Sequence, residues 1–417
     1  MKKIEVWANC YFLEEPQKIG VLTASNVRGK EIFSFEYEKS WLKGQSAFQI
    51  DPQLQLFTGN FYAAEGIENF GTFLDSSPDR WGRTLMLRRE ALLAKEEKRG
   101  IKSLMPSDYL LGVFDPTRMG ALRFKIGDGP FLDDQKNIST PPWTSIRELE
   151  QASLFLEQEG SEEDPHFSAQ LKLLFAPGSP LGGARPKASV LDENGNLWMA
   201  KFPSRDDLKD VGAWESVVYK LAGRCGITVN EVKTQKFANK YHTFLTKRFD
   251  RLSGGKRVHF SSAMTLLQYK DGVNHQTGVS YLELADFISA NGAPSKVDAN
   301  LEELWRRIVF SIAVSNSDDH LRNHGFLLSE EGWELSPVYD VNPNEMAEGL
   351  SLNISWDSNA LDFDLAKSVA QDFRVVSPKA NEIIEKIKFE VRNWDKIAES
   401  FGISRSERLR MAKAFRV

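Results

Sequence analysis

The chain has 417 residues, of which 41% are hydrophobic and 27% charged, with a formal net charge of −5. This is the composition of a globular protein too long for one ordinary core, and its charge provides no general attraction for nucleic acid or anionic membranes. Two cysteines exclude a disulfide framework, no apolar run approaches the roughly 18 residues that span a bilayer, and the start lacks an apolar signal segment, so we expect a cytoplasmic protein.

The first 140 residues are expected to form a small sheet-rich subdomain. Short alternating runs such as "IEVWANCYF" and "EIFSFEYEKSWL" predict antiparallel strands up to about residue 70. A basic, leucine-bearing helix is predicted over about residues 80–97, followed by a short helix, a turn and a strand in "SDYLLGVFDPTRMGALRF". A segment rich in Pro, Ser and Thr near 137–145 predicts a boundary.

Residues 141–252 and 253–417 are expected to differ in character. The former contain a helix over about 145–159, the loop "APGSPLGGARPK", a hairpin with an Asn-Gly turn, a helix closed by Gly226, and two further strands. The latter are mainly helical, with "YLELADFISANG", "NLEELWRRIVFSIAVSNS" and "NEIIEKIKFEVRNWDKIAESFG" as predicted helices. A strand-rich part followed by a helix-rich part predicts two lobes with a cleft.

A dense polar cluster, "NSDDHLRNHGFLL" (316–328), stands between two apolar segments. Asp318 and Asn323 are five residues apart, and Asp340 follows an apolar hairpin. Phosphoryl transfer needs a carboxylate that accepts the proton of the incoming hydroxyl, and an amide and a second acid that hold magnesium. Protein kinases use the same five-residue separation and the same later aspartate. The cluster therefore predicts a phosphotransferase site.

The residues upstream supply the other parts of such a site. Lys201 lies on the second strand of the predicted hairpin, and the following helix presents Glu215 as its carboxylate partner. The loop "SPLGGARPK" (179–187) precedes the first strand. Its glycines permit close backbone approach to phosphates, and Arg185 and Lys187 can face anionic oxygens. The order of these parts is that of protein kinases, and no Walker A motif is present.

Several of these residues also have ordinary structural interpretations. Asp318 could cap the preceding helix, and Lys201 could be a strand-end lysine. His320 and His324, four residues apart, could form a metal pair, although His320 is more simply expected to hold the loop by hydrogen bonding to backbone. Glu215 could be a surface residue of its helix.

Three short motifs also have more than one interpretation. The charges of Arg185 and Lys187 could be solvated, and "SPDRWGR" is expected to be an architectural helix start. The segment "IAESFGIS" with its following basic helix has the pattern of a helix-turn-helix, although the end of a kinase C-lobe packs similar helices.

Taken together, seven segments resemble one family: "FLDSSPDRWGR", "DYLLGVFDPTRMGALRF", "GGARPKA", "AKFPS", "TKRFDR", "NSDDHLRNHGFLL" and "LSPVYDV". In this order, over nearly the whole chain, they are similar to the HipA family, the serine/threonine-kinase-like toxins of bacterial type II toxin–antitoxin systems. The resemblance implies an α+β, bilobed protein-kinase-like fold. It would consist of a HipA-type N-terminal subdomain (1–140), a sheet-rich N-lobe with the phosphate loop (141–252) and an all-helical C-lobe (253–417).

The resemblance also implies roles for the residues that match the family's motifs. Asp318 would be the catalytic base, Asn323 and Asp340 the Mg²⁺ ligands, and Lys201 the lysine that contacts the ATP phosphates. Ser179 would be the autophosphorylated serine whose modification silences the kinase. The remaining candidate residues of the ATP site are Gly182, Gly183, Ala184, Arg185, Lys187, Glu215, Lys247, Phe249 and His320, with Lys247 and Phe249 contacting adenine through their backbone.

The implied function is that of an ATP- and Mg²⁺-dependent protein serine/threonine kinase that acts as a toxin. Its protein substrate is unidentified; an aminoacyl-tRNA synthetase or another translation component fits the resemblance. The implied partner is a HipB-like DNA-binding antitoxin, through which DNA is contacted indirectly, and no membrane is involved. One departure is Trp214, which precedes Glu215 where the family usually has asparagine. The alternatives are a catalytically silent kinase-like regulator that binds DNA or an antitoxin, and a small-molecule kinase.

Overall fold

The computed structural model describes residues 1–64, 66–132, 140–175, 183 and 185–417. The chain folds into two compact units. Unit 1 contains Met1–Asp206 and Asp250–Ser261, and unit 2 contains Asp207–Phe249 and Ser262–Val417. The expected division at residues 140 and 252 stays a prediction. Among the described residues, every helix is too short or too polar to cross a lipid bilayer.

Unit 1 begins with an antiparallel sheet whose strand order is β4-β3-β2-β1-β5. The strands are β1 (Lys2–Ala8), β2 (Gln17–Val27), β3 (Lys30–Tyr37), β4 (Asn60–Tyr62) and β5 (Leu122–Lys125). Burial alternates along them, because successive side chains of a strand point to opposite faces. The strands expected before residue 70 are therefore present. The run after β3 instead forms a short helix, α1 (Lys39–Lys43), which buries Trp41.

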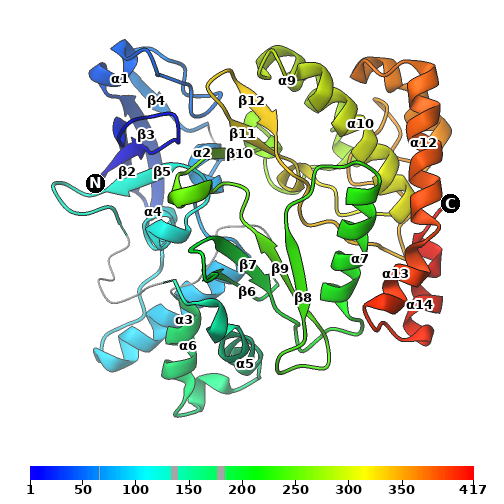
Figure 1. Ribbon diagram of the computed structural model, residues 1–417. Coiled ribbons are helices and arrows are strands. Elements are labelled where there is room, and N and C mark those ends of the chain that lie inside the picture. Colours follow the sequence, from blue (N-terminus) through cyan, green and yellow to red (C-terminus); the bar gives the residue numbers. More distant parts are fainter. Residues whose placement is uncertain (65, 133–139, 176–182, 184) are drawn as a thin grey trace. The chain divides into compact units, whose positions relative to one another are not determined.

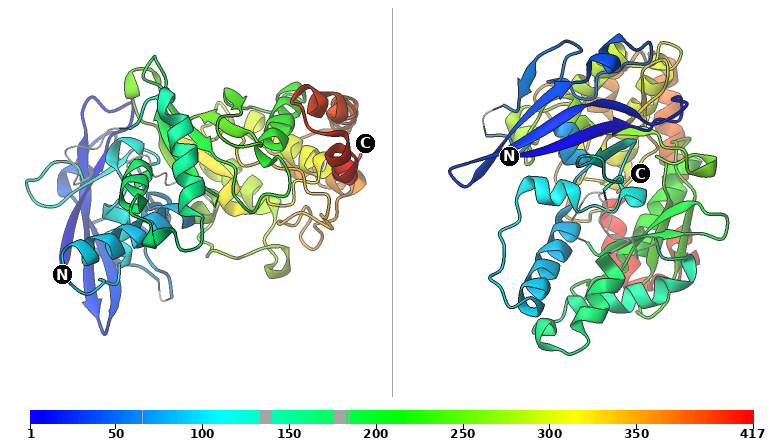
Figure 2. Two further views of the ribbon diagram at one scale, coloured as in Figure 1. Left: turned by 90° about the horizontal axis from the view of Figure 1, so that it is seen from below. Right: turned by 90° about the vertical axis from the view of Figure 1, so that its left-hand side faces the viewer.

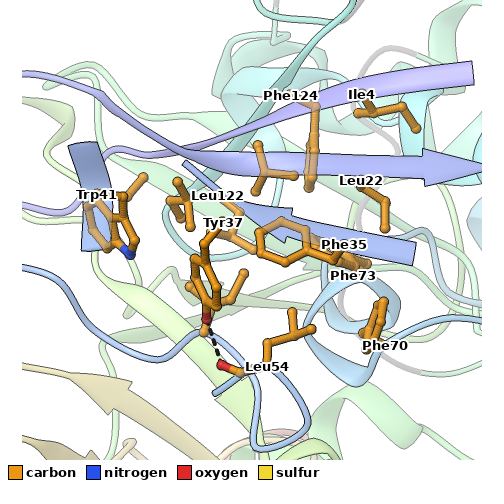
Figure 3. Packing of buried hydrophobic residues seen from close by; sticks show 14 of the residues in the cluster. Ile4, Leu22, Phe35, Tyr37, Trp41, Leu54, Phe70, Phe73, Leu122 and Phe124 are labelled. Atoms are coloured by element: carbon orange, nitrogen blue, oxygen red, sulfur yellow. Dashed lines mark hydrogen bonds between the residues drawn. The ribbon is translucent and has the colours of Figure 1, made fainter. Parts of the chain in front are cut away.

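The buried face of this sheet carries a hydrophobic core within unit 1 (Figure 3). Aromatic side chains dominate it, and Phe35 packs against both Tyr37 and Phe73 at ring-centroid distances of 5.0 and 5.9 Å. The Tyr37 hydroxyl donates a hydrogen bond of 2.7 Å to the carbonyl of Leu54, so its polar end is satisfied inside the core. Each such ring contributes about 1.5–3 kcal/mol when fully buried.

The further α-helices of unit 1 are α2 (Gly71–Asp75), α3 (Arg80–Glu96), α4 (Pro106–Leu111), α5 (Ile146–Leu156) and α6 (Phe167–Phe175). Helix α6 contacts both α3 and α5; the three helices are labelled in Figure 1 and can be followed by colour in the turned views of Figure 2. Helix α3 begins where "SPDRWGR" predicts, because the Asp79 carboxylate caps it by accepting a 2.7 Å bond from the Gly82 amide. Strands β6 (Lys187–Leu191) and β7 (Leu197–Lys201) form the predicted antiparallel hairpin. Gly195 takes a positive φ of 75° in its turn.

Unit 2 is mainly helical. Its helices are α7 (Val211–Arg224), α8 (Ala263–Leu266), α9 (Tyr281–Asn291), α10 (Val297–Val314), α11 (Phe363–Ser368), α12 (Ser377–Val391), α13 (Trp394–Ser400) and α14 (Arg405–Met411). Helix α10 packs against α9 and α12 (Figure 1). The helix expected over "NEIIEKIKFEVRNWDKIAESFG" is divided into α12 and α13, with Arg392 and Asn393 between them.

Unit 2 also contains two hairpins. One is β8 (Val232–Gln235) with β9 (Thr243–Lys247), as predicted. The other is β11 (Gly325–Leu328) with β12 (Trp333–Leu335), which follows the polar cluster. The expectation that residues 253–417 are all-helical is therefore wrong, because they contain this second hairpin, whose apolar residues alternate at strand spacing, as well as a further short strand. The chain passes from unit 1 to unit 2 within strand β10 (His259–Ser262), between Ser261 and Ser262. The expected α+β class is confirmed.

Candidate active site

The polar loop starts where α10 ends. Helix α10 stops at Val314, and Ser315 takes a left-handed conformation with φ 51° as its cap, so Asp318 does not cap the helix. The side chain of Asp318 is 71% exposed. Asn323 is only 8% exposed, and its amide Nδ2 donates a 2.6 Å hydrogen bond to the backbone carbonyl of Asp318. This bond leaves the Oδ1 of Asn323 as the atom to offer a cation, which suits a magnesium ligand.

The loop contains a second acid, Asp319, whose role the sequence analysis missed. Asp319 is buried, and its carboxylate accepts hydrogen bonds from the Tyr281 hydroxyl and, at 2.7 Å, from the Ser351 amide. Nε2 of His324 lies 3.1 Å from the Asp319 carbonyl oxygen. Burial raises the pKa of Asp319 to about 7, and the charge of Asp318 adds to the rise. Asp319 therefore anchors the loop that exposes Asp318.

The two histidines of the loop lie in different environments. Burial lowers the pKa of His324 to about 3, so this ring is neutral at physiological pH. His320 is half-buried, with Nε2 3.6 Å from Oδ1 of Asp318, and its carbonyl accepts a 2.8 Å bond from the Asn323 amide. The described residues contain no group of three or more His, Cys, Asp or Glu side chains that could hold a metal ion. A magnesium ion held here would take further ligands from nucleotide phosphates and water.

Asp340 lies beside this loop because the residues on either side of it are bonded to the loop. The Tyr339 hydroxyl donates a 2.7 Å bond to the carbonyl of Arg322, and the Asn342 amide donates a 3.2 Å bond to Oδ1 of Asn316. Asp340 itself has a positive φ of 57°. Such a conformation is uncommon for a non-glycine residue and clusters at functional sites.

Helix α7 presents Glu215 to the interior of unit 2. Glu215 is 2% exposed, so its interpretation as a surface residue is wrong. One turn later the hydroxyl of Tyr219 donates a 3.2 Å bond to the carbonyl of Val338, which ties α7 to the segment leading to Asp340. Burial, followed by the charges of Glu215 and Asp340, raises the pKa of Tyr219 well above its ordinary value. Tyr219 thus links the helix that carries Glu215 to the segment that carries Asp340.

The candidate adenine-contacting segment also belongs to unit 2. The Lys247 amide donates a 2.9 Å bond to the Glu231 carbonyl, so a backbone contact from Lys247 to a nucleotide would have to use its carbonyl oxygen. The ring of Phe249 packs against Tyr339 with 5.5 Å between centroids. Tyr339 thus contacts both Phe249 and the loop that carries Asn323. The signal that could have found Tyr339 is its place directly before a candidate metal ligand.

The remaining candidates lie in unit 1. Lys201, the last residue of β7, pairs in register with Lys187 of β6, so these side chains project from the same face of the hairpin. Lys187 is 1% exposed, and its Nζ lies 2.8 Å from Oδ2 of Asp79 and 3.4 Å from the Gly183 carbonyl. Its interpretation as a solvated loop charge is therefore wrong.

The rest of the candidate phosphate loop is partly described. Gly183 has a positive φ of 102°, and its carbonyl accepts a 3.4 Å bond from the Trp81 amide. Arg185 is half-buried. Ser179, Gly182 and Ala184 lie outside the described residues. Lys187 and Trp81 thus hold the Gly183 carbonyl at the first turn of α3.

Comparison with known proteins shows which family the chain resembles. Residues 179–394, more than half of the chain, match the family described as HipA-like C-terminal domain. A putative kinase of Haemophilus influenzae is 25% identical over 182 residues, which cover 39% of this chain and 52% of the relative. The chain thus spans about half the length of this curated relative.

Two solved structures are similar to the chain. The Shewanella oneidensis HipA of a toxin–antitoxin complex with HipB and operator DNA gives a TM-score of 0.62 at 17% identity. That match covers 99% of this chain and 94% of the other, and it supports the fold. The Helicobacter pylori proinflammatory kinase CtkA gives a TM-score of 0.37 at 14% identity, covering 55% and 92% of the two chains, which is too low to bear on the fold. On the family match over residues 179–394, this chain belongs to the HipA family.

Proposed function

We propose that the chain is an ATP- and Mg²⁺-dependent protein serine/threonine kinase. The observation that carries the proposal is the exposed carboxylate of Asp318, presented by a loop that Asn323 and the buried Asp319 hold in place and that Asp340 flanks. This is the arrangement that phosphoryl transfer to a hydroxyl needs, because the protein's task there is positioning and charge stabilisation.

In the proposed mechanism Asp318 orients the hydroxyl of the substrate serine or threonine and accepts its proton. The hydroxyl oxygen forms a bond to the γ-phosphorus as the bond between that phosphorus and the bridging oxygen to ADP breaks. Asn323 and Asp340 would hold the metal, and Lys201 would counter phosphate charge. A bound magnesium ion would neutralise the charge that develops on the phosphate oxygens.

Replacement of Asp318 by asparagine tests this assignment. We expect Asp318→Asn to lower phosphoryl transfer from labelled ATP by about a hundredfold or more, the usual contribution of a positioned general base. Nucleotide binding, followed as a ligand-dependent rise in melting temperature, should persist. Asp298→Asn, which changes an exposed acid at the start of α10, is the matched control. Transfer by Asp318→Asn at the wild-type rate would contradict the mechanism.

We further propose that the kinase acts as the toxin of a type II toxin–antitoxin system with a HipB-like antitoxin. The Shewanella HipA of similar fold, which is in complex with HipB and operator DNA, supports this. The proposed substrate is an aminoacyl-tRNA synthetase or another translation component, and the proposed location is the cytoplasm. Incubating the protein with labelled ATP in a bacterial lysate and identifying the labelled residue would test the substrate class. Label confined to small molecules would favour a small-molecule kinase instead.

Autophosphorylation of Ser179 is the proposed means of silencing the enzyme. A phosphate there would add about −1.5 to −2 charges to the loop that is proposed to meet the ATP phosphates, so we expect phosphorylation to inhibit. Mass spectrometry of active and inactive fractions, with Ser179→Ala as control, measures this. A fully active fraction that carries stoichiometric phosphate at Ser179 would rule it out.

A further inference from the structure

Trp214, the residue before Glu215 on α7, is buried against the C-terminal segment of the chain. It is 1% exposed, and its indole Nε1 donates a 2.8 Å hydrogen bond to Oε1 of Glu407 on α14. Its ring lies 6.2 Å from that of Trp394 and 6.1 Å from that of Phe415. The residue next to the buried Glu215 is thus fixed by a segment almost 200 residues away.

The carboxylate of Glu407 holds the start of α7 through a second bond. Its Oε1 also accepts a 2.9 Å bond from the backbone amide of Asp210, the residue that caps α7. A negative charge at this end of a helix is favourable, because the first amides of a helix carry partial positive charge. Glu407 therefore sets the position of the first turn of α7, the turn that precedes Glu215.

The same segment contacts the candidate catalytic loop. The ring of Phe415 stacks on Trp394 at 4.4 Å. Its neighbour Arg416 donates three hydrogen bonds: from its amide to the Ala313 carbonyl at 2.8 Å, from Nε to the Ser315 hydroxyl at 3.0 Å, and from Nη2 to the Ala347 carbonyl at 3.1 Å. Ser315 is the left-handed residue from which the loop with Asp318 begins.

Both residues that the Arg416 side chain contacts, Ser315 and Ala347, are connected to the candidate site. The Ser315 carbonyl accepts a 3.2 Å bond from the Asn344 amide, and Nδ2 of Asn344 donates a 2.7 Å bond to the Ser317 hydroxyl. Ala347 follows Asn344 in the segment after Asp340. Arg416 thus bridges the residues that lead into Asp318 and those that follow Asp340.

We propose that Glu407, Phe415 and Arg416 form a C-terminal brace, a set of positioning residues that aligns the candidate site without touching substrate. The brace holds three parts in one arrangement: α7 with Glu215, the start of the loop with Asp318, and the segment after Asp340. Its effect on catalysis rests on the kinase activity proposed above, whereas its effect on local order does not.

Arg416→Ala is the first test. It removes the side-chain bonds to Ser315 and Ala347 and keeps the backbone bond to Ala313. We expect kcat for phosphoryl transfer to fall about tenfold with the KM for ATP within about twofold, because the loss affects alignment rather than binding. Arg416→Lys, which keeps one cationic donor, should recover part of the loss. Lys413→Ala, an exposed cation three residues earlier, is the control.

Glu407→Ala is the second test, with Arg405→Ala, an exposed residue of the same helix, as its control. It leaves the Asp210 amide and the Trp214 indole without their shared acceptor, so the kcat should fall similarly. Glu407→Gln, which keeps an acceptor oxygen, should retain most of the wild-type rate.

Hydrogen exchange separates failure of the brace from failure of the kinase proposal. In Arg416→Ala the amides of Asn316 and Asn344 should exchange faster than in the wild type and in Lys413→Ala. Unchanged exchange, or an unchanged kcat in an active protein, would overturn the brace. Faster exchange in a protein that transfers no phosphate even as wild type would leave the brace standing and reject the kinase. If the unfolded fraction of the variant, measured by thermal melts, accounts for the whole loss of kcat, the contact only stabilises the fold. That result would also overturn the proposal.

Discussion

At the scale of single residues, two adjacent acids of one loop are placed in opposite environments. Asp318 is exposed, whereas Asp319 is buried and bonded to Tyr281 and the Ser351 amide. Proteins give neighbouring carboxyl groups different roles by placing them in environments that shift their pKa values apart. Here the division is between a group that can meet a substrate and a group that fixes the loop.

The buried acid makes stability depend on pH with a defined sign. Because the pKa of Asp319 is raised in the folded protein to about 7, its protonated form contributes stability that is complete below the unfolded value near 3.8. That stability is lost as the pH rises toward about 7. The isosteric Asp319→Asn cannot ionise, so its melting temperature should fall less than that of the wild type between pH 5 and about 7.5.

Differential scanning fluorimetry across this range measures the effect, with Asp298→Asn as an exposed control. Equal slopes for the wild type and Asp319→Asn would show that Asp319 keeps an ordinary pKa in the folded state. A steeper slope for the variant would contradict the burial argument altogether.

At the scale of elements, a buried ion pair joins the β6–β7 hairpin to the start of helix α3. The side chains of Lys187 and Asp79 are each 2% exposed and 2.8 Å apart. Asp79 at the same time caps α3. The pair therefore connects β6 to the start of α3 within unit 1, and it brings the segments "SPDRWGR" and "GGARPK" into contact.

Removing only the cation should be more harmful than removing both charges. Lys187→Met removes the buried cation that faces the Asp79 carboxylate, and breaking a buried ion pair by removing one member typically costs about 3–5 kcal/mol of unfolding free energy. The double variant Asp79→Asn with Lys187→Met also removes the charge of that carboxylate and keeps a capping oxygen, so it should be more stable than the single variant. Urea denaturation measures both.

The half-exposed pair of Arg83 and Glu68 is the matched control in the same helix region, because Glu68→Ala should cost no more than about 1 kcal/mol. A loss of that small size for Lys187→Met as well would mean that the buried pair contributes no more than an exposed one.

At the scale of the whole molecule, nucleotide binding should raise the stability of the folded protein and therefore its melting temperature. A nucleotide that binds only the folded state stabilises it by about 2.7 kcal/mol at a hundredfold excess over its dissociation constant. If Asn323 and Asp340 hold magnesium, the ATP-dependent rise in melting temperature should shrink when EDTA removes the metal. In Asp340→Asn it should become nearly independent of magnesium, while Asp372→Asn, an exposed acid of unit 2, should behave as the wild type. A magnesium-dependent shift of full size in Asp340→Asn would remove Asp340 from the metal site.

Local order along the chain was determined by the sequence itself. Apolar periodicity placed α3, α7, α9 and α10, an Asn-Gly pair placed the turn of the β6–β7 hairpin, and the spacing of Asp318 and Asn323 identified the loop that the structure holds together. These features depend on neighbours within a few residues, which is the range over which propensity and periodicity act.

Only the tertiary structure decided which distant groups meet. Lys187 meets Asp79 from 108 positions away, Trp214 meets Glu407 from 193 positions away, and Asp319 is buried although its neighbour is exposed. Burial of Glu215 likewise follows from packing within unit 2. No periodic pattern encodes such contacts, because a charged side chain finds its partner only after the hydrophobic faces of separate elements have packed and excluded water from both.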